Sequence, residues 1–281
     1  RGEPLPITQE QVPLHGHAIE VRLYAEDPDN DFLPATGTLE LYREPAPGPG
    51  RRVDSGVSEG DPVSPFYDPM LGKLIAWGET REEARQRLLA MLDETLVGGV
   101  KTNLAFLRRV LAHPAFASAE LDTGFISRHQ AVLLPLPGQL PEAFWQAAAD
   151  AFIQSEASMC RADDPHSPWS ARNGWRAGLG AETELHLVCN GSERKVRPSG
   201  RNQLQGENLV CPRQEGDTQV QYRLPAIRRG TTLYLEWQGE LQAVSRFDPI
   251  AAVEASHGHQ GGLTAPMSGS IVRVLVEAGQ R

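Results

Sequence analysis

Alternating apolar and polar positions predict β-strands near the start of the chain. In residues 18–24 every second residue is apolar, and Arg22 occupies one of the polar positions between them. That period of two is typical of a half-buried strand, which would present Arg22 on its polar face. Residues 37–42 and 73–77 are further candidate strands, and Gly78 would end the last of them.

A helical period then replaces this alternation and predicts two helices. Thr80 and Glu83 match a capping box, in which a hydroxyl and a carboxylate satisfy the unpaired N–H groups of the first turn. Apolar residues continue at helical spacing as far as Leu96, and the glycines that follow would end this helix. A second apolar stripe predicts another helix over residues 102–113. Two helices after strands indicate an α+β layer.

Residues 141–247 predict one helix followed only by strands. Pro141 suits the first turn of a helix, and the apolar positions after it cover a broad surface, so this helix would be enclosed on most sides. Short strand patterns follow, and Gln238-Gly239 would turn the last two into a hairpin. Antiparallel strands wrapped around a single helix could form a barrel, which would also remove exposed sheet edges. The strand candidates are residues 184–188, 193–197, 218–224, 232–237 and 240–247.

Two changes of composition divide the 281 residues, which is a length typical of about two domains. A Pro-, Leu- and Gly-rich link spans residues 133–138, and a linker rich in Ala, His and Gly precedes a new strand pattern at Leu263. We therefore predict domains at 1–133 and 134–250, a linker at 251–262 and the start of a third unit at 263–281. The chain begins with Arg1 and stops just after a strand-like run, so we expect it to be a piece of a longer protein.

Charge and cysteine content exclude several classes of function. Lys and Arg number 27 against 36 Asp and Glu, a net charge of −9 that argues against nucleic acid or an anionic membrane as partner. No apolar run approaches the roughly 18 residues of a membrane-spanning helix. The three cysteines form no CxxC motif, so neither a disulfide framework nor a zinc site is expected. Reduced thiols in a cytosolic protein are the simplest interpretation.

Two motifs that could suggest ligand binding are incomplete. The pairs His15-Gly16-His17 and His257-Gly258-His259 lack neighbouring carboxylates or thiols, so we expect no metal site. Residues 48–52 are glycine- and arginine-rich, but no Gly-Lys-Ser/Thr ending and no helix follow, so they predict a solvated turn and no phosphate loop.

Arg22 and Asp68 are the candidates for chemistry, and each allows two interpretations. Arg22 is either a surface charge on an edge strand or a fixed guanidinium able to stabilise an oxyanion. Asp68 either caps the turn before residues 73–77 or anchors a guanidinium such as that of Arg22. The pattern alone leaves both questions open.

Five blocks in the first part of the chain resemble the C-terminal part of biotin carboxylase, an ATP-grasp enzyme. They follow one another in the order and spacing of that family. The blocks are GHAIEVRLYAEDP (16–28), FLPATG (32–37), YDPMLGKL (67–74), GVKTN (99–103) and TGFI (123–126).

The end of the chain carries a second resemblance. TAPMSGSIV (264–272) is similar to the opening of a biotin carboxyl carrier domain. That order resembles the biotin-containing α subunit of acyl-CoA carboxylases, which places a BT domain, a long helix inside an antiparallel β-barrel, between the two. Residues 164–169 and 174–176 look most like the methylcrotonyl-CoA or geranyl-CoA carboxylase branch.

The resemblance implies a reaction and roles for three residues. Biotin carboxylase uses ATP and Mg²⁺ to activate bicarbonate and carboxylates biotin. Arg22 matches the arginine that stabilises the biotin enolate, Asp68 matches an acidic position that would orient it, and Ile126 matches a position that packs on adenine. The implied partners are a carboxyltransferase β subunit that docks on the BT domain and carries the acyl-CoA, and a second biotin carboxylase domain. The implied location is the bacterial cytoplasm.

Other parts of the family pattern lie outside this sequence. The ATP lid, the Mg²⁺ carboxylates and the general base would precede Arg1, and the lysine that receives biotin would follow Arg281. We therefore expect this chain alone to be inactive and residues 1–133 to pack poorly in isolation. One alternative is an assembly module without catalysis. Another is the same α subunit serving propionyl-, acetyl- or geranyl-CoA.

Overall fold

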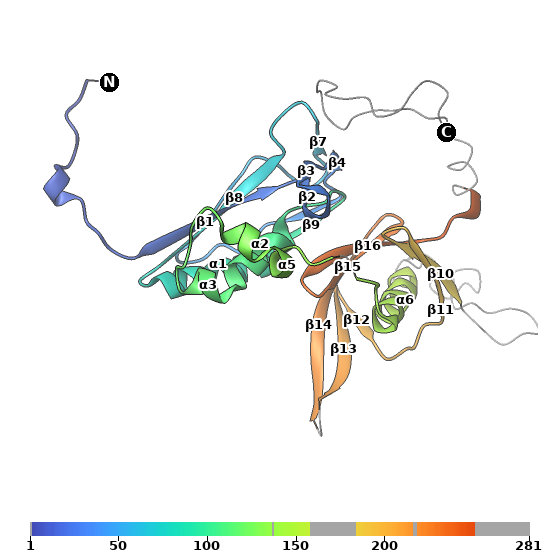
Figure 1. Cartoon of the computed structure of the whole chain (residues 1–281). Helices are drawn as coiled ribbons and strands as arrows, with labels where there is room; N and C mark the ends of the chain where they lie inside the picture. Colours follow the sequence, from blue (N-terminus) through green and yellow to red (C-terminus); the bar gives the residue numbers. More distant parts are fainter. Residues whose placement is uncertain (1, 137, 158–183, 216–217, 251–281) are drawn as a thin grey trace, which may run out of the picture.

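The computed structural model describes residues 2–136, 138–157, 184–215 and 218–250. Within these ranges the fold is α+β, as predicted, and Figure 1 shows a sheet-and-helix layer beside a second body in which strands surround a helix. The motif residues at 164–176 and 264–272 and the pair His257 and His259 lie outside the described residues.

A three-stranded antiparallel sheet forms the centre of the first domain. Its order is β1 (His17–Tyr24), β8 (Met70–Gly78) and β6 (Arg51–Ser55), and helix α1 (Arg81–Glu94) contacts all three strands. The alternation predicted for residues 18–24 is confirmed. The side chains of Val21 and Leu23 pack in the core beneath α1, and Glu20 and Arg22 lie on the opposite face, because successive side chains of a strand point to opposite sides.

Helix α1 begins where the capping box predicts and ends earlier than predicted. Thr80 Oγ1 accepts a hydrogen bond from Glu83 N at 3.2 Å, while the Glu83 carboxylate accepts from Glu79 N at 2.9 Å and so reaches one residue further back than the motif predicts. The prediction that the helix continues through Leu96 is wrong. Leu96–Gly98 is strand β9, which pairs with β5 (Leu41–Arg43).

The single strand predicted over residues 37–42 is two strands. Gly37–Thr38 (β4) pairs with Pro62–Val63 (β7), whereas β5 pairs with β9. Glu40 N donates to Thr38 O at 2.9 Å, and this tight turn redirects the chain from one strand pair to the other. Two further short strands, Glu26–Asp27 (β2) and Leu33–Pro34 (β3), pair with each other.

Short helices complete the first domain. The predicted second helix is α2 (Leu104–Ala112), which ends before Pro114 as expected. The sequence did not predict the short elements around it: η1 (Gln9–Gln11), η2 (Pro28–Asn30), α3 (Pro114–Ala117), α4 (Phe125–Arg128) and α5 (Gln130–Leu133).

The second domain is built around helix α6 (Glu142–Ala157). Phe144, Trp145 and Phe152 of this helix are fully buried, and α6 contacts strands from both ends of a seven-stranded antiparallel sheet, so the predicted enclosure is confirmed. The sheet order is β11 (Ser192–Val196), β10 (Leu185–Cys189), β16 (Glu240–Arg246), β15 (Thr232–Trp237), β14 (Thr218–Arg229), β13 (Asn208–Glu215) and β12 (Gln203–Gln205).

The turn between β15 and β16 was predicted from the sequence, whereas several features of the neighbouring strands were not. Gln238 and Gly239 have φ values of 55° and 85° and form the predicted hairpin turn between β15 and β16, which needs positive φ at both positions. Strands β12 and β13 were not predicted. Strand β14 extends five residues beyond the strand predicted over residues 218–224. Together with β13 it projects from the domain as a hairpin (Figure 1).

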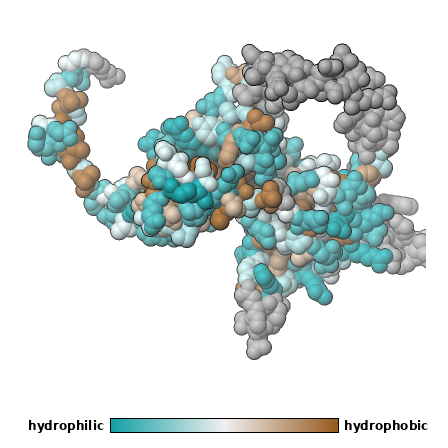
Figure 2. Space-filling model, viewed as in Figure 1, coloured by the Kyte–Doolittle hydropathy of each residue, from teal (hydrophilic) through white to brown (hydrophobic). Residues whose placement is uncertain are grey.

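The N-terminal segment exposes apolar side chains along an extended path. Leu5, Ile7, Val12 and Leu14 are all at least 48% exposed, and Figure 2 shows hydrophobic residues along this arm. A surface of this kind is typical of a segment that contacts another part of a protein or a partner. Among the described residues, no helix has the length and apolar character needed to cross a membrane.

Candidate functional site

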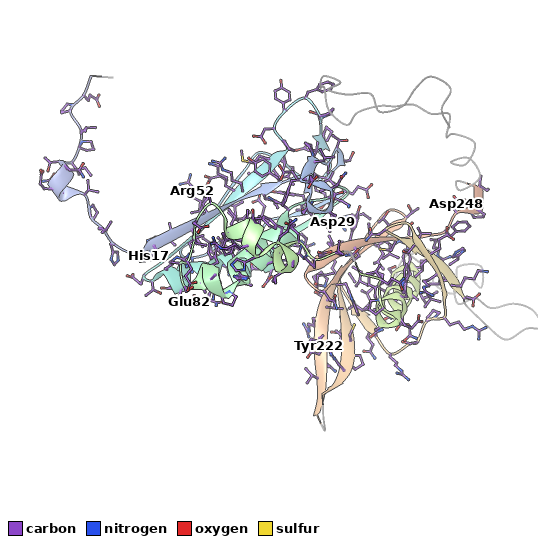
Figure 3. All side chains as sticks on the ribbon, in the orientation of Figure 1. His17, Asp29, Arg52, Glu82, Tyr222 and Asp248 are labelled. Atoms are coloured by element: carbon purple, nitrogen blue, oxygen red, sulfur yellow. The ribbon has the colours of Figure 1, made fainter. Side chains whose placement is uncertain are left out.

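Arg22 stands on a charged face of the β1–β8–β6 sheet. The register places Arg22, Lys73 and Asp54 in one row across the three strands, and Arg52, labelled in Figure 3, lies in the next row. Arg22 Nε is 3.8 Å from Glu20 Oε1, and Lys73 Nζ is 3.7 Å from the same oxygen. The Arg22 side chain is 58% exposed. A guanidinium presented in this way can donate parallel hydrogen bonds to an anionic oxygen pair.

Asn103 holds the backbone of this strand from behind. Its Nδ2 donates to Arg22 O at 3.1 Å, its Oδ1 accepts from Tyr24 N at 3.0 Å, and its own N donates to Tyr24 O at 3.2 Å. Asn103 is only 6% exposed, at the N-terminal cap of α2. The amide therefore fixes the backbone next to the exposed guanidinium. The sequence indicated no role for Asn103, and the only signal was its place at the end of the block 99–103.

Asp68 lies at the same end of the sheet but does not pair with Arg22. Its Oδ1 accepts from Met70 N at 3.1 Å, which agrees with the turn-capping interpretation. Burial and the negative charge of Asp68 raise the pKa of Glu26 above its ordinary value, so these two carboxyl groups are neighbours. Within the described residues the ion partner of Arg22 is Glu20. The role of Asp68 in orienting Arg22 stays a prediction.

Ile126 lies on the short helix α4, which is not part of the β1–β8–β6 sheet. Its side chain is 47% exposed, while its neighbour Phe125 is buried and packs in a cluster with Phe106 and Leu133. The cluster anchors α4 and leaves Ile126 available to contact a planar group. Contact with adenine stays a prediction.

The remaining candidates behave as ordinary structural groups. Nε2 of His15 is 3.1 Å from the Glu79 carboxylate, and among the described residues no group of three or more His, Cys, Asp or Glu is arranged to hold a metal. Burial raises the pKa of both Cys189 and Cys211 to about 11, which makes each thiol a poor nucleophile at neutral pH. Cys160 lies outside the described residues.

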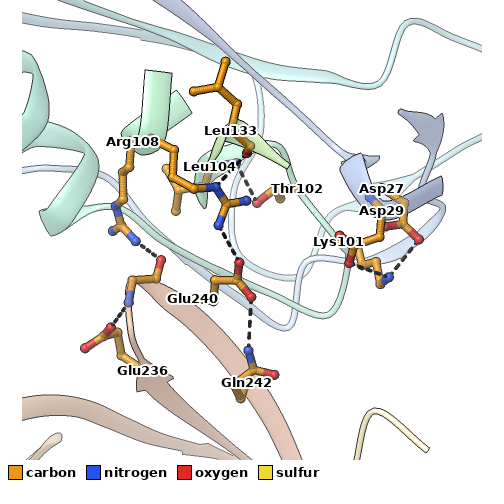
Figure 4. Close-up of polar contacts among 12 residues, drawn as sticks. Asp27, Asp29, Lys101, Thr102, Leu104, Arg108, Leu133, Glu236, Glu240 and Gln242 are labelled. Atoms are coloured by element: carbon orange, nitrogen blue, oxygen red, sulfur yellow. Dashed lines mark hydrogen bonds and ion pairs between the residues drawn. The ribbon is translucent and has the colours of Figure 1, made fainter. Parts of the chain in front are cut away.

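A groove of about 750 Å³ lies where the two domains meet, lined by residues of both. Figure 4 shows the polar contacts along it. Lys101 Nζ is 2.8 Å from Asp27 Oδ2, and Arg109 Nη1 is 3.0 Å from Glu240 Oε1. These charges of the lining are thus matched within the chain, which is typical of a structural joint between domains.

Comparison with known domain families accounts for both bodies. Residues 20–128 match the biotin carboxylase C-terminal domain, and residues 141–259 match the BT domain of the methylcrotonyl-CoA carboxylase alpha subunit. Each of the two parts of the chain is thus similar to one of these two domain families. The blocks around Arg22, Asp68 and Ile126 fall within the matched biotin carboxylase domain, and α6 and its sheet fall within the matched BT domain.

Known proteins that are similar to this chain extend beyond it. The mitochondrial methylcrotonoyl-CoA carboxylase subunit alpha of Arabidopsis thaliana is 42% identical over 98% of the chain and 45% of its own length. The protein of the same name from Rattus norvegicus is 31% identical over 100% of the chain and 42% of its own length. The solved biotin carboxylase subunit of a pyruvate carboxylase is 39% identical over 47% of the chain and 29% of its own length, with a TM-score of 0.46. The chain thus spans less than half the length of these relatives.

Proposed function

We propose that the chain is part of the biotin-containing alpha subunit of a methylcrotonyl-CoA-type carboxylase. Its first domain would contribute to the ATP- and bicarbonate-dependent carboxylation of biotin, and its BT domain would hold a carboxyltransferase β subunit. The observation that carries the first part is Arg22, an exposed guanidinium on a strand whose backbone Asn103 fixes. The match to both domain families, in this order, supports the second part.

The chemistry of the Arg22 side chain fits the biotin ring. Bound biotin would supply a ureido nitrogen that takes up the carboxyl group, and negative charge would develop on the ring oxygen. Arg22 would donate hydrogen bonds to that oxygen, and the positive charge of its guanidinium would stabilise the negative charge that develops there. Glu20, 3.8 Å from Arg22 Nε, would keep the side chain directed along the sheet face.

ATP and Mg²⁺ fit this chain only in part. Ile126 would contact the adenine ring through its exposed side chain. Among the described residues no carboxylate cluster suits a metal ion, so Mg²⁺ would be held by other parts of the whole protein. The compartment expected from the sequence, the bacterial cytoplasm, stays a prediction, since the curated relatives include mitochondrial proteins.

The names of the relatives support a proposal for the acyl substrate and the assembly. Two relatives that match nearly the whole of this chain are named methylcrotonoyl-CoA carboxylase. Their name favours 3-methylcrotonyl-CoA over propionyl-, acetyl- or geranyl-CoA as the substrate. The β subunit would bind this acyl-CoA, and two biotin carboxylase domains would contact each other. Recovery of a carboxyltransferase β subunit with the tagged whole protein from its native host, followed by assays on these acyl-CoAs, tests both points. Recovery without any carboxylase activity would instead favour an assembly module.

The whole alpha subunit carrying Arg22→Ala tests the catalytic role. We expect biotin-dependent ATP cleavage, measured with free biotin and bicarbonate, to fall by about a hundredfold or more, because a fixed donor to a developing oxyanion is lost. ATP binding should stay unchanged. Arg52→Ala is the matched control, since Arg52 lies on the same face but forms a bidentate pair with Asp54 at 2.8 and 2.9 Å. Near-normal turnover of Arg22→Ala would remove Arg22 from the mechanism.

A further inference from the structure

Asn103, which holds the strand of Arg22, lies between two segments that the BT domain contacts. Strand β9 ends five residues before Asn103, at Gly98, and helix α2 begins directly after it at Leu104. The BT domain touches both segments, through Tyr234 on β15 and through the β15–β16 turn. Residues 96–109 are here called the braced segment.

Tyr234 packs directly on Gly98. A Cβ atom at Gly98 would lie 2.5 Å from Cε1 of the Tyr234 ring, so only glycine allows the two domains to approach this closely. Tyr234 is 3% exposed and belongs to a buried cluster with Leu41, Leu96 and Ile227. The BT side chain therefore fixes the position of β9 without a gap between the domains.

Two arginines of α2 hold the other side of the braced segment. Arg108 donates to the Gly239 carbonyl in the β15–β16 turn and to Leu92 O, at 2.6 Å, at the end of α1. The Arg108 side chain is 13% exposed, and burial lowers its pKa, so it is an internal link between three elements. Arg109 Nη1 is 3.0 Å from Glu240 Oε1.

Two ion pairs on another side of the same joint involve no side chain of the braced segment, although the backbone of Arg43 pairs with Leu96. Arg43 Nη2 is 2.5 Å from Glu207 Oε2, and Arg229 Nε is 2.8 Å from Glu59 Oε1. Both join the two domains through exposed side chains. The pair of Arg229 and Glu59, neither of which belongs to β5 or β9, therefore offers a control for effects that come from weakening the joint in general.

We propose that the BT domain is a positioning element for Arg22. Tyr234 and the β15–β16 turn would hold the braced segment, and Asn103 in its middle would set the backbone of β1 at Arg22 and Tyr24. Subunit docking on the BT domain and carboxylation at Arg22 would then be coupled through this segment. The coupling matters for catalysis only if Arg22 serves the reaction proposed above.

The test uses the whole alpha subunit with Gly98→Ala, which drives a methyl group into the Tyr234 ring. Tyr24 N donates a hydrogen bond to Asn103 Oδ1. Hydrogen exchange at this amide should accelerate about tenfold, because the hydrogen bond opens more often. The kcat for biotin-dependent ATP cleavage with free biotin should fall at least threefold, with the Kd for ATP unchanged. Glu240→Gln, a milder change that weakens the contact with Arg109, should act in the same direction.

Arg229→Gln is the control, and it should alter neither the exchange at Tyr24 nor the kcat. Adding Gly98→Ala to Tyr234→Ala should have no further effect, because the ring that the methyl group meets is gone. Unchanged Tyr24 exchange in Gly98→Ala, or equal effects in Arg229→Gln, would overturn the proposal. Co-purification with the β subunit and wild-type turnover are measured in the same preparations. A wild-type protein that shows no co-purification or no turnover would contradict the proposed function. The exchange rate at Tyr24 would still test whether the BT domain positions β1 through the braced segment.

Discussion

The hydroxyl of Tyr234 in the BT domain donates a 2.6 Å hydrogen bond to Oε2 of Glu40 in the biotin carboxylase domain, across 194 positions of sequence. Burial, the bond and the negative charge of Glu40 all raise the pKa of Tyr234. The phenol therefore stays protonated and remains a donor at every physiological pH. Because this bond and the apolar cluster around it join the two domains, we expect them to unfold as one cooperative unit.

Tyr234→Phe should lower the free energy of unfolding by about 1–2 kcal/mol, because Glu40 loses its donor in a half-buried place while the ring contacts remain. Urea denaturation of the purified chain measures this. Tyr67→Phe is the matched control, since Tyr67 is 83% exposed and should shift the midpoint very little. Equal effects of the two changes would show that the hydroxyl of Tyr234 contributes nothing to the joint.

Acid should weaken the joint through Glu59 and Glu207. A hydrogen bond from Arg229 lowers the pKa of Glu59 below its ordinary 4.5, and one from Arg43 does the same for Glu207. Because the folded pKa is the lower one, the contribution of each pair is present above about pH 4.5 and is lost as pH falls through the folded pKa. We expect the urea midpoint to drop between pH 6 and pH 3.

The double variant Glu59→Gln and Glu207→Gln isolates this effect from other carboxyl groups. It should be less stable than the wild type at pH 6 and should approach it in acid, because protonated glutamate and glutamine are both uncharged. A constant difference between the two proteins across this range would assign the acid sensitivity to other groups, among them Glu82, whose pKa Arg85 and Gln86 lower to about 2.

Asn103→Ala should destabilise the chain by about 2–3 kcal/mol, since it leaves Arg22 O and Tyr24 N without their side-chain partner in a part-buried place. Asn103→Asp retains the acceptor for Tyr24 N and loses only the donor to Arg22 O, so its loss should be smaller. Urea unfolding measures both. In the whole protein, kcat with free biotin should follow the same order, and an Asp variant as impaired as Ala would place the important bond at Arg22 O.

Local sequence patterns predicted the elements whose causes are local. The cap at Thr80, the broad apolar surface of α6 and the turn at Gln238-Gly239 depend on neighbours within a few residues, and all three are present. Leu96 was assigned to a helix because it continues an apolar stripe. Its actual state depends on pairing with Arg43, which no local pattern encodes.

In the candidate site, too, the sequence predicted features with local causes and missed those that depend on distant residues. Strand alternation was enough to place Arg22 on a polar face, because one residue decides the side of the sheet. The alternation could not reveal that Asn103, 81 positions away, holds the Arg22 carbonyl. It also could not reveal that Asp68 has Glu26 as its charged neighbour, since a turn fixes which groups approach only after the sheet has formed.

The cysteines supply the last prediction. Burial raises the pKa of Cys189 and Cys211 to about 11, so at pH 8 only about one thiol in a thousand is ionised. Since the thiolate is the reactive form, both should label with a disulfide reagent far more slowly in the folded chain than in urea. A Cys160→Ser background leaves only these two thiols to count. Rapid labelling at Cys189 would mean that β10 opens away from Gln242, whose Oε1 lies 3.8 Å from its sulfur, and would make this part of the BT sheet a mobile element rather than a fixed support for the joint.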